Sequence, residues 1–486
     1  MKFPIFHANQ EIVHIFFMRG VGMKKVKIGG SILALAVLAG MFLVPESIGL
    51  SRSGINTLGL LIAIIIALVT EPLPIGIICM LGVPLMVVFG VYPNIGGALC
   101  GYTNHILYFV LVSFGISEAM AKVPLSKRLL LGMVRLFGSK SEKVLLAVMV
   151  AAAAMSSIMS NVATTAVLVT VVLDFLKVYD NEEERKRSGR AFMIGLPIAS
   201  MLGGMITPAG SPLNMLGMDF LESEAHMTVS FVQWMVIGTP VAVLMVLFSW
   251  FMIVKVFKPA PIDAVKTEEY LKSLNIPDKF DIHEKYVALI VLVMFVLWIL
   301  SSWFPFLAIT VVGMIGFAFL FIPGIGVLEW KEYTSKVSWA SFFLIGTMMS
   351  FGSALSVNGV SHWIVEKLFS GDMNLPIPAI IFLIAIAVFA LLIPIPIGPA
   401  LISSLGLPFI GLAASWGISP VVLIMTLVLC AANCFLLPLD TVPLLTYTTG
   451  YYKMTDMPKV SVVIQLCIAI CLSIWLPISL GILGLM

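Results

Sequence analysis

The chain reads Ser-Ser-Ile-Met-Ser-Asn-Val-Ala-Thr-Thr over residues 156–165, inside a mostly apolar run from Leu145 to Leu176. That run is too long for a buried strand and long enough to enter a lipid bilayer and return. Polar side chains at membrane depth are tolerated mostly where they face a cavity or a ligand. We interpret the stretch as the tip of a re-entrant hairpin over about 142–176 and as one half of a solute site. The structural alternative, close helix packing by Ser and Thr, explains Asn161 less well.

The composition indicates that most of the chain lies in a membrane. Of its 486 residues, 60% are hydrophobic and only 11% are charged, whereas a soluble chain carries about twice that charged fraction. We expect an all-α polytopic membrane protein with about eleven transmembrane helices and two re-entrant hairpins. The net charge of +3 gives no indication of nucleic-acid binding. The six cysteines lack metal-site spacing, and we interpret them as helix-packing residues.

Basic residues predict the topology. They flank the hairpin on both sides, from Lys122 to Lys143 and again from Lys177 to Arg190. Both flanks are therefore expected in the cytoplasm, so that the run between them dips into the membrane and returns. A first helix over about 29–47 follows three lysines and places the N-terminus in the cytoplasm. A last helix over about 460–482 then places the C-terminus outside the inner or plasma membrane.

A helix predicted over about 191–218 is interrupted by Gly-Gly-Met-Ile-Thr-Pro-Ala-Gly-Ser-Pro-Leu-Asn at residues 203–214. Two prolines and three glycines in the middle of a span predict an unwound stretch with free backbone groups. Such a stretch survives at membrane depth only when it is buried in protein or lines a site. The alternative is a proline-kinked helix without a ligand.

A second set of the same elements follows. A hairpin is predicted over about 377–414, with outer flanks poor in Lys and Arg, and a helix over about 420–448 is broken at Leu-Pro-Leu-Asp-Thr, residues 437–441. The predicted organisation is a cytoplasmic or interfacial segment 1–28, a first half 29–257, a cytoplasmic linker 258–284 and a second half 285–486. Because the hairpins enter from opposite sides, the halves form an inverted repeat, the architecture of secondary transporters.

An inverted repeat predicts where a solute binds. The two hairpin tips should meet the two helix breaks, which brings Gly398, Pro399 and Thr441 of the second half into the site. N-termini of half-helices favour anions, and unwound carbonyls favour Na⁺. These stretches hold no Lys or Arg, so they indicate a small anion without saying which one.

From about residue 29 to its end, the chain resembles the divalent anion:sodium symporter family, in particular the sodium/dicarboxylate cotransporters. The motifs that carry this resemblance lie in order at 70–74, 160–166, 207–214, 437–443 and 450–451. The resemblance implies a homodimer with a scaffold domain and a transport domain that moves like an elevator. It implies import of a small organic or inorganic anion, such as a di- or tricarboxylate, coupled to Na⁺ and without an organic cofactor.

The resemblance also implies roles for individual residues. Na⁺ would be held by Ser156, Ser160 and Asn161 with the unwound backbone of Gly203 and Gly204. The substrate would contact the first tip and the first break, at Ser160, Asn161, Thr207, Pro208, Gly210 and Ser211.

The chain departs from the family pattern in three places. Val162 stands where the first tip usually has Thr, Ile397-Gly398-Pro399 replaces Ser-Asn-Thr in the second tip, and Asp440 replaces a Gly. These departures weaken the expectation of a second Na⁺ site and of a dicarboxylate clamped at both ends. We expect a substrate with one strongly held anionic end, or one held by backbone groups alone. The alternative function is a proton-coupled symporter or an anion exchanger of the same fold, with the second Na⁺ site lost.

Three interpretations of Asp440 stay open. It could supply a negative ligand for a cation, carry a coupling proton, or cap the N-terminus of a half-helix. Functions from other classes are less compatible with the sequence. An enzyme would need a nucleophile-and-base or metal cluster, which the sequence lacks, and a channel would not need two inverted broken helices. A sensor that has lost transport is a further alternative.

Overall fold

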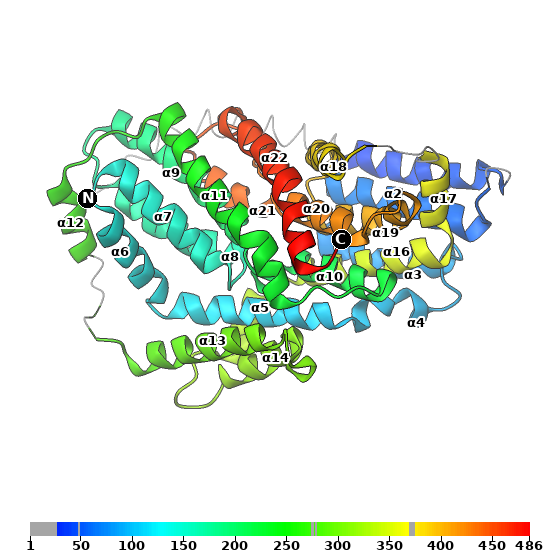
Figure 1. Cartoon of the computed structure of the whole chain (residues 1–486), viewed down its shortest axis with the longest axis horizontal. Coiled ribbons are helices and arrows are strands. Elements are labelled where there is room, and N and C mark those ends of the chain that lie inside the picture. Colours follow the sequence, from blue (N-terminus) through cyan, green and yellow to red (C-terminus); the bar gives the residue numbers. More distant parts are fainter. Residues whose placement is uncertain (1–26, 47–48, 274–276, 278, 369–374) are drawn as a thin grey trace. The chain divides into compact units, whose positions relative to one another are not determined.

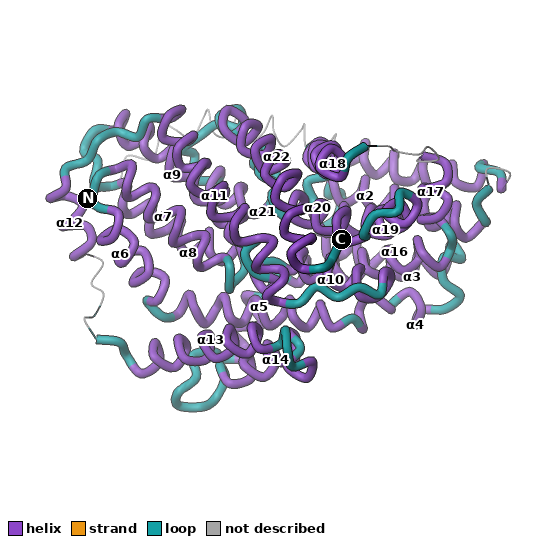
Figure 2. Tube along the Cα trace, in the orientation of Figure 1, coloured by secondary structure: helices purple, strands orange, loops and turns teal. Residues whose placement is uncertain are grey.

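The computed structural model describes the chain except for residues 1–26, 47–48, 274–276, 278 and 369–374. The segment predicted over 1–28 therefore lies almost entirely outside the described residues. The described part contains helices and no strand (Figures 1 and 2). Among these residues, seven helices are long and apolar enough to cross a membrane: α2 (Arg52–Thr70), α5 (His105–Lys122), α11 (Phe231–Phe257), α13 (Ile282–Leu300), α16 (Trp339–Val357), α19 (Gly398–Ser415) and α22 (Pro458–Leu483).

The remaining helices are shorter or less apolar. Six of them are apolar: Lys27–Leu43, α3 (Ile75–Val88), α8 (Asn161–Leu176), α14 (Ile309–Phe319), α18 (Ile377–Leu391) and α20 (Pro420–Ala431). The others are α4 (Ile95–Ala98), α6 (Leu125–Phe137), α7 (Ser141–Ser156), α9 (Glu182–Gly203), α10 (Pro212–Ala225), α12 (Ala264–Ser273), α15 (Trp330–Lys336), α17 (Val360–Leu368) and α21 (Thr441–Tyr447). The helical content and the apolar spans agree with the expected polytopic helical membrane protein.

The chain forms two compact units, and each unit contains segments from both predicted halves. The first unit comprises residues 1–103 and 339–368, and the second comprises residues 104–338 and 369–486. In the first unit, α16 packs against α2 and α3. The Tyr102 hydroxyl lies 2.7 Å from Thr347 Oγ1, and the Gly101 amide donates to Ser350 Oγ at 3.0 Å.

The second unit contains two sets of helices with the same order of packing. In the first set, α7 and α8 pack on each other and against α9; in the second set, α18 and α19 each pack against α20. The long helices that close the two sets, α11 and α22, pack against each other (Figure 1). In both sets, the two helices that flank the turn pack on the helix that leads into the break.

The short helices after the two breaks connect the sets. α10 packs against α19 and α20 of the other set, and α21 packs against α8 and α9. Each half-helix therefore lies against the helix–turn–helix of the opposite set. This crossing brings the turns of the two helix pairs and the two breaks into one region of the second unit.

The first break is built from local signals. α9 ends at Gly203, and α10 begins at Pro212, whose missing N–H costs nothing at the first helical position. Ser211 is the N-cap and accepts the Leu213 amide at 3.3 Å. Gly203 is still helical, in contrast to the unwound backbone expected there. A Cβ on Gly203 would lie 2.4 Å from the Cα of Ala153, so this glycine permits close packing of α9 on α7.

Candidate functional site

The first turn joins α7 to α8 and holds the polar cluster of residues 156–165. Ser156, the last residue of α7, is fully buried, and its hydroxyl donates to Asn161 Oδ1 at 2.5 Å. Asn161 is the first residue of α8. The preceding Ser160 donates its amide to Ser117 Oγ on α5 at 3.2 Å. The turn therefore holds the Asn161 side chain at the N-terminus of a 16-residue helix, where the helix dipole favours negative charge.

Oxygen atoms of the first turn and the first break gather around two glycines. A Cβ on Gly204 would lie 2.5 Å from Asn161 Oδ1, so the Asn161 amide packs directly on the Gly204 backbone. A Cβ on Gly210 would lie 2.7 Å from the Gly204 carbonyl and 3.0 Å from the Ser156 carbonyl. Two carbonyls and an amide oxygen, with the Ser156 hydroxyl, form the kind of oxygen-rich set that a hard cation prefers.

Two further side chains hold the first break in place. Asn214 is fully buried, and its Nδ2 donates to the Gly204 carbonyl at 2.7 Å and to the Thr207 carbonyl at 2.9 Å. The Thr207 hydroxyl donates to the Ser157 carbonyl and accepts the Gly210 amide at 3.0 Å. Asn214 Oδ1 has no protein partner. Because an unpaired buried acceptor costs about 1–3 kcal/mol, this oxygen is suited to a ligand.

Sequence reasoning did not assign a role to Asn214. The residue closes the Thr-Pro-Ala-Gly-Ser-Pro-Leu-Asn stretch of the first break, two positions after the second proline. A mid-membrane Asn within one turn of an unwound segment was the available signal, because only a long-range contact would satisfy its amide at that depth.

The second turn meets the first break. Gly398 begins α19, and a Cβ there would lie 2.8 Å from Leu213 Cδ1 and 3.3 Å from the Ala431 carbonyl. Gly398, from the second predicted tip, thus lies against the start of α10 from the first half. Pro399 follows in the first turn of α19. Thr441, at the start of α21, is exposed.

Asp440 is the N-cap of α21, a helix of seven residues. Its Oδ1 accepts the Val442 amide at 2.9 Å. Of the three interpretations of Asp440, the capping role thus has its hydrogen bond in the structure. The carboxylate lies at the opposite break from the oxygen cluster of Asn161 and Gly204.

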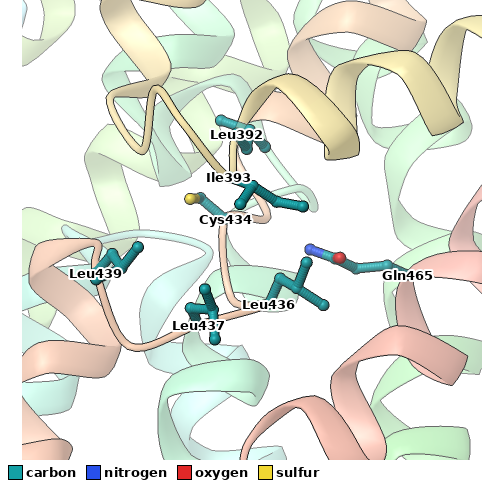
Figure 3. Close-up of a pocket in the computed structure, with 7 residues that line it drawn as sticks. All are labelled: Leu392, Ile393, Cys434, Leu436, Leu437, Leu439 and Gln465. Atoms are coloured by element: carbon teal, nitrogen blue, oxygen red, sulfur yellow. The ribbon is translucent and has the colours of Figure 1, made fainter. Parts of the chain in front are cut away.

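The second break is lined mainly by apolar side chains (Figure 3). A cavity of about 10 Å³, room for about one water molecule, lies between the turn after α18 and the stretch after α20. It is lined by Leu392, Ile393, Cys434, Leu436, Leu437, Leu439 and Gln465. When Pro208 and Pro438 are aligned, Leu437 takes the place of Thr207. Leu392 likewise takes the place of Ser157, since each is the C-cap of its helix.

A larger cavity of about 210 Å³ lies elsewhere in the second unit. His105, Asp219 and Glu222 are among its lining residues, and Asn104 Nδ2 donates to both carboxylate oxygens of Asp219 at 3.1 Å. None of the residues predicted for the solute site lines it, so we do not include it in the candidate site.

The several apolar spans and the two broken helices of the described residues are those of a polytopic helical membrane protein. The model of the sodium:sulfate symporter transmembrane region matches residues 25–483. The chain belongs to this family, which confirms the resemblance to the divalent anion:sodium symporters. It is therefore an integral membrane transporter and not an enzyme.

Individual relatives share little sequence identity with this chain, but the matches cover most of its length. The sodium-dependent dicarboxylate transporter SdcS of Staphylococcus saprophyticus is 24% identical over 459 residues, which cover 88% of this chain and 86% of the relative. SdcS of Staphylococcus aureus is 25% identical over 415 residues, or 78% of each chain. A membrane protein of Cupriavidus necator is 22% identical over 352 residues, covering 69% of this chain and 68% of the relative.

Proposed function

We propose that this chain is a secondary active transporter that imports a small organic or inorganic anion coupled to Na⁺. The observation that carries this proposal is the oxygen cluster formed by Ser156, Asn161 and Gly204 at the N-terminus of α8. The family match and the relatives named as sodium-dependent dicarboxylate transporters support Na⁺ as the coupling ion. They also support a carboxylate or sulfate-like substrate.

In this proposal, the cation and the anion bind side by side at the first break. The Ser156 hydroxyl, Asn161 Oδ1 and the Gly204 carbonyl ligate Na⁺; Asn214 donates from Nδ2 to the same Gly204 carbonyl, and its Oδ1 has no protein partner. The anion contacts Asn161, Ser211 and the N-terminus of α8. Because the tips and breaks contain no Lys or Arg, the bound Na⁺ supplies the positive charge that the anion needs, which couples the two bindings.

We further propose that a homodimer in the plasma membrane carries out this transport by an elevator-like movement, with the N-terminus in the cytoplasm and the C-terminus outside. The crossing of α10 and α21 between the two helix sets supports this, because it ties both tips and both breaks into one packed group. A group tied in this way is suited to move as a unit across the membrane.

The second candidate is a proton-coupled symporter or an anion exchanger of the same fold. The leucine-lined second break and the Asp440 carboxylate favour it, because they remove polar ligands from the place of a second cation and add a titratable group.

Uptake into proteoliposomes tests both candidates. Labelled succinate, citrate and sulfate are offered with a Na⁺ gradient, with a proton gradient, with both and with neither. Na⁺-driven uptake of one of these anions supports the first candidate, and uptake driven by protons or by internal anion alone supports the second. Asn161→Ala should abolish Na⁺-driven uptake. Thr170→Ala, which removes an exposed hydroxyl from the same helix α8, is the matched control and should preserve it.

A further inference from the structure

We propose that the substrate carries a single anionic group, held at the first half-site, and that its other end faces the second half-site uncharged. This inference rests on the proposed function and deepens it. It concerns two regions. The first half-site is defined as the turn 156–161 with the break 204–214, and the second half-site as the turn 392–399 with the break 432–441.

The first half-site offers groups suited to one anionic head. Asn161 and Ser211 contribute an amide and a hydroxyl, and α8 presents the free N–H groups of its first turn. Thr207 and Asn214 fix the backbone between them through hydrogen bonds to Ser157, Gly204 and Gly210. This rigid polar set holds a carboxylate or a sulfonate without any basic side chain.

The second half-site has no equivalent set. Gly398 has no side chain where the first turn has Asn161, and Pro399 removes one N–H from the first turn of α19. Leucines occupy the positions that correspond to Thr207 and Ser157. The cavity lining has one amide, that of Gln465, and one N–H of its Nε2 donates to the Asn433 carbonyl at 3.0 Å; Asn433 itself donates from Nδ2 to the Leu429 carbonyl at 2.7 Å. A second anionic group would find only the remaining N–H groups of these two amides and the exposed Thr441 hydroxyl, and no cluster of donors like that of Asn161 and Ser211.

The negative charge of Asp440 would also repel a second anionic group of the substrate. Its carboxylate accepts the Val442 amide, the second N–H of α21, so that donor is not available to a second anion. Like charges a few ångströms apart in a medium of low effective dielectric constant oppose each other strongly. The far end of the substrate therefore meets leucines and a carboxylate, which accommodate an apolar or hydroxylated end and exclude a second acid group.

Matched pairs of small anions test the inference in proteoliposomes with an inward Na⁺ gradient. Ethanesulfonate is compared with ethane-1,2-disulfonate, and 3-hydroxypropionate with succinate, at pH 7.5. Protein-free liposomes and Asn161→Ala proteoliposomes correct for leakage. We expect kcat/KM to be at least about tenfold higher for the monoanion of each pair. Asp440→Asn should reduce that ratio about tenfold or more, because Asn keeps the cap and removes the charge. Leu444→Met, on the exposed side of α21, is the control and should leave the ratio unchanged.

The outcomes separate the inference from the proposed function. Na⁺-driven uptake in which the dianions are preferred overturns the inference and leaves the proposed function standing. Absence of Na⁺-driven uptake for all four anions and for sulfate and citrate overturns the proposed function. A preference for monoanions that Asp440→Asn leaves unchanged overturns the role of Asp440. Asp440→Ser, a second capping residue without charge, repeats that test should the Asn variant fold poorly.

Discussion

The break between α9 and α10 and the break between α20 and α21 share a backbone plan but differ in lining. In each, the carbonyl two residues beyond the end of the leading helix accepts a side-chain N–H from the long helix that follows. Trp234 Nε1 donates to the Met205 carbonyl and Gln465 Nε2 to the Asn433 carbonyl, both at 3.0 Å. Around this common plan, the first break gathers hydroxyls and amides, whereas the second has the single amide of Asn433 among leucines; Asn433 Oδ1, like Asn214 Oδ1, has no protein partner.

The difference shows that a repeated architecture does not require repeated chemistry. Backbone hydrogen bonds keep both breaks open, since unpaired carbonyls at membrane depth are costly. Ligand binding depends on a few polar side chains, and most of these lie at the first break. The following substitutions test this asymmetry.

Gly204→Ala should have the largest effect. The added Cβ would lie 2.5 Å from Asn161 Oδ1 and displace that amide from the cluster. We expect Na⁺-driven uptake to fall at least about tenfold. Counted from the last residue of the leading helix, the second break has Ala432 where the first has Gly204. Ala432→Gly should therefore change uptake by less than about threefold, apart from the usual cost of glycine near a helix end. Equal effects of the two substitutions would contradict the asymmetry.

Thr207→Val tests the hydrogen bond that joins the first break to the first turn. It leaves the buried Ser157 carbonyl without its hydroxyl donor, so we expect a loss of about 1–3 kcal/mol in unfolding free energy. Thermal unfolding of the purified protein in detergent measures it. Thr207→Ser keeps the hydroxyl and is the control. Leu437→Thr, the reverse change in the second break, should not strengthen the Na⁺ dependence of uptake.

Trp234→Phe and Gln465→Met test the side-chain hydrogen bond to a backbone carbonyl that both breaks have. Each removes one hydrogen bond to a break carbonyl, and each should lower the unfolding free energy by about 1–2 kcal/mol. The effects should add in the double variant, since the two hydrogen bonds share no residue. A change in Na⁺ affinity is expected only for Trp234→Phe.

The smallest effect is expected at Asp456, in the loop after α21. Burial raises the pKa of its carboxyl, but hydrogen bonds from Lys459 and the Lys453 amide and the charge of Arg190 lower the pKa overall. A lowered folded-state pKa contributes stability above the unfolded value, and this is lost as pH falls through the folded value. Asp456→Asn should therefore reduce thermal stability at neutral pH and weaken its decline in acid. If the variant lost as much thermal stability in acid as the wild type does, this loop would contribute nothing to that loss.

Sequence patterns located the helix pairs closely. The hairpin expected over 142–176 corresponds to α7 and α8 over 141–176, and the one over 377–414 to α18 and α19 over 377–415. Glycines, prolines and polar tips are local signals that end helices. α9 begins earlier than the helix predicted to start near residue 191. It begins at Glu182, because Asn181 caps it and three acidic residues occupy its first turn.

Long-range contacts were beyond the reach of the sequence. No local sequence pattern predicts that Trp234 and Gln465 donate hydrogen bonds to backbone carbonyls in the breaks. None predicts that Asn214 donates a hydrogen bond to the Gly204 carbonyl. The helical state of Gly203 was also missed, because its reason is the approach of Ala153 from another helix. The two compact units mix segments of both sequence halves, and such grouping depends on packing that no local pattern encodes.

Stabilisation by Na⁺ is the most direct test that the first half-site alone holds the coupling cation. The melting temperature of the purified transporter is measured against NaCl concentration, with choline chloride keeping the ionic strength constant, since a ligand of the folded state raises it. The account predicts stabilisation in the wild type and in Asp440→Asn, and none in Asn161→Ala. Stabilisation that persists in Asn161→Ala and disappears in Asp440→Asn would contradict it.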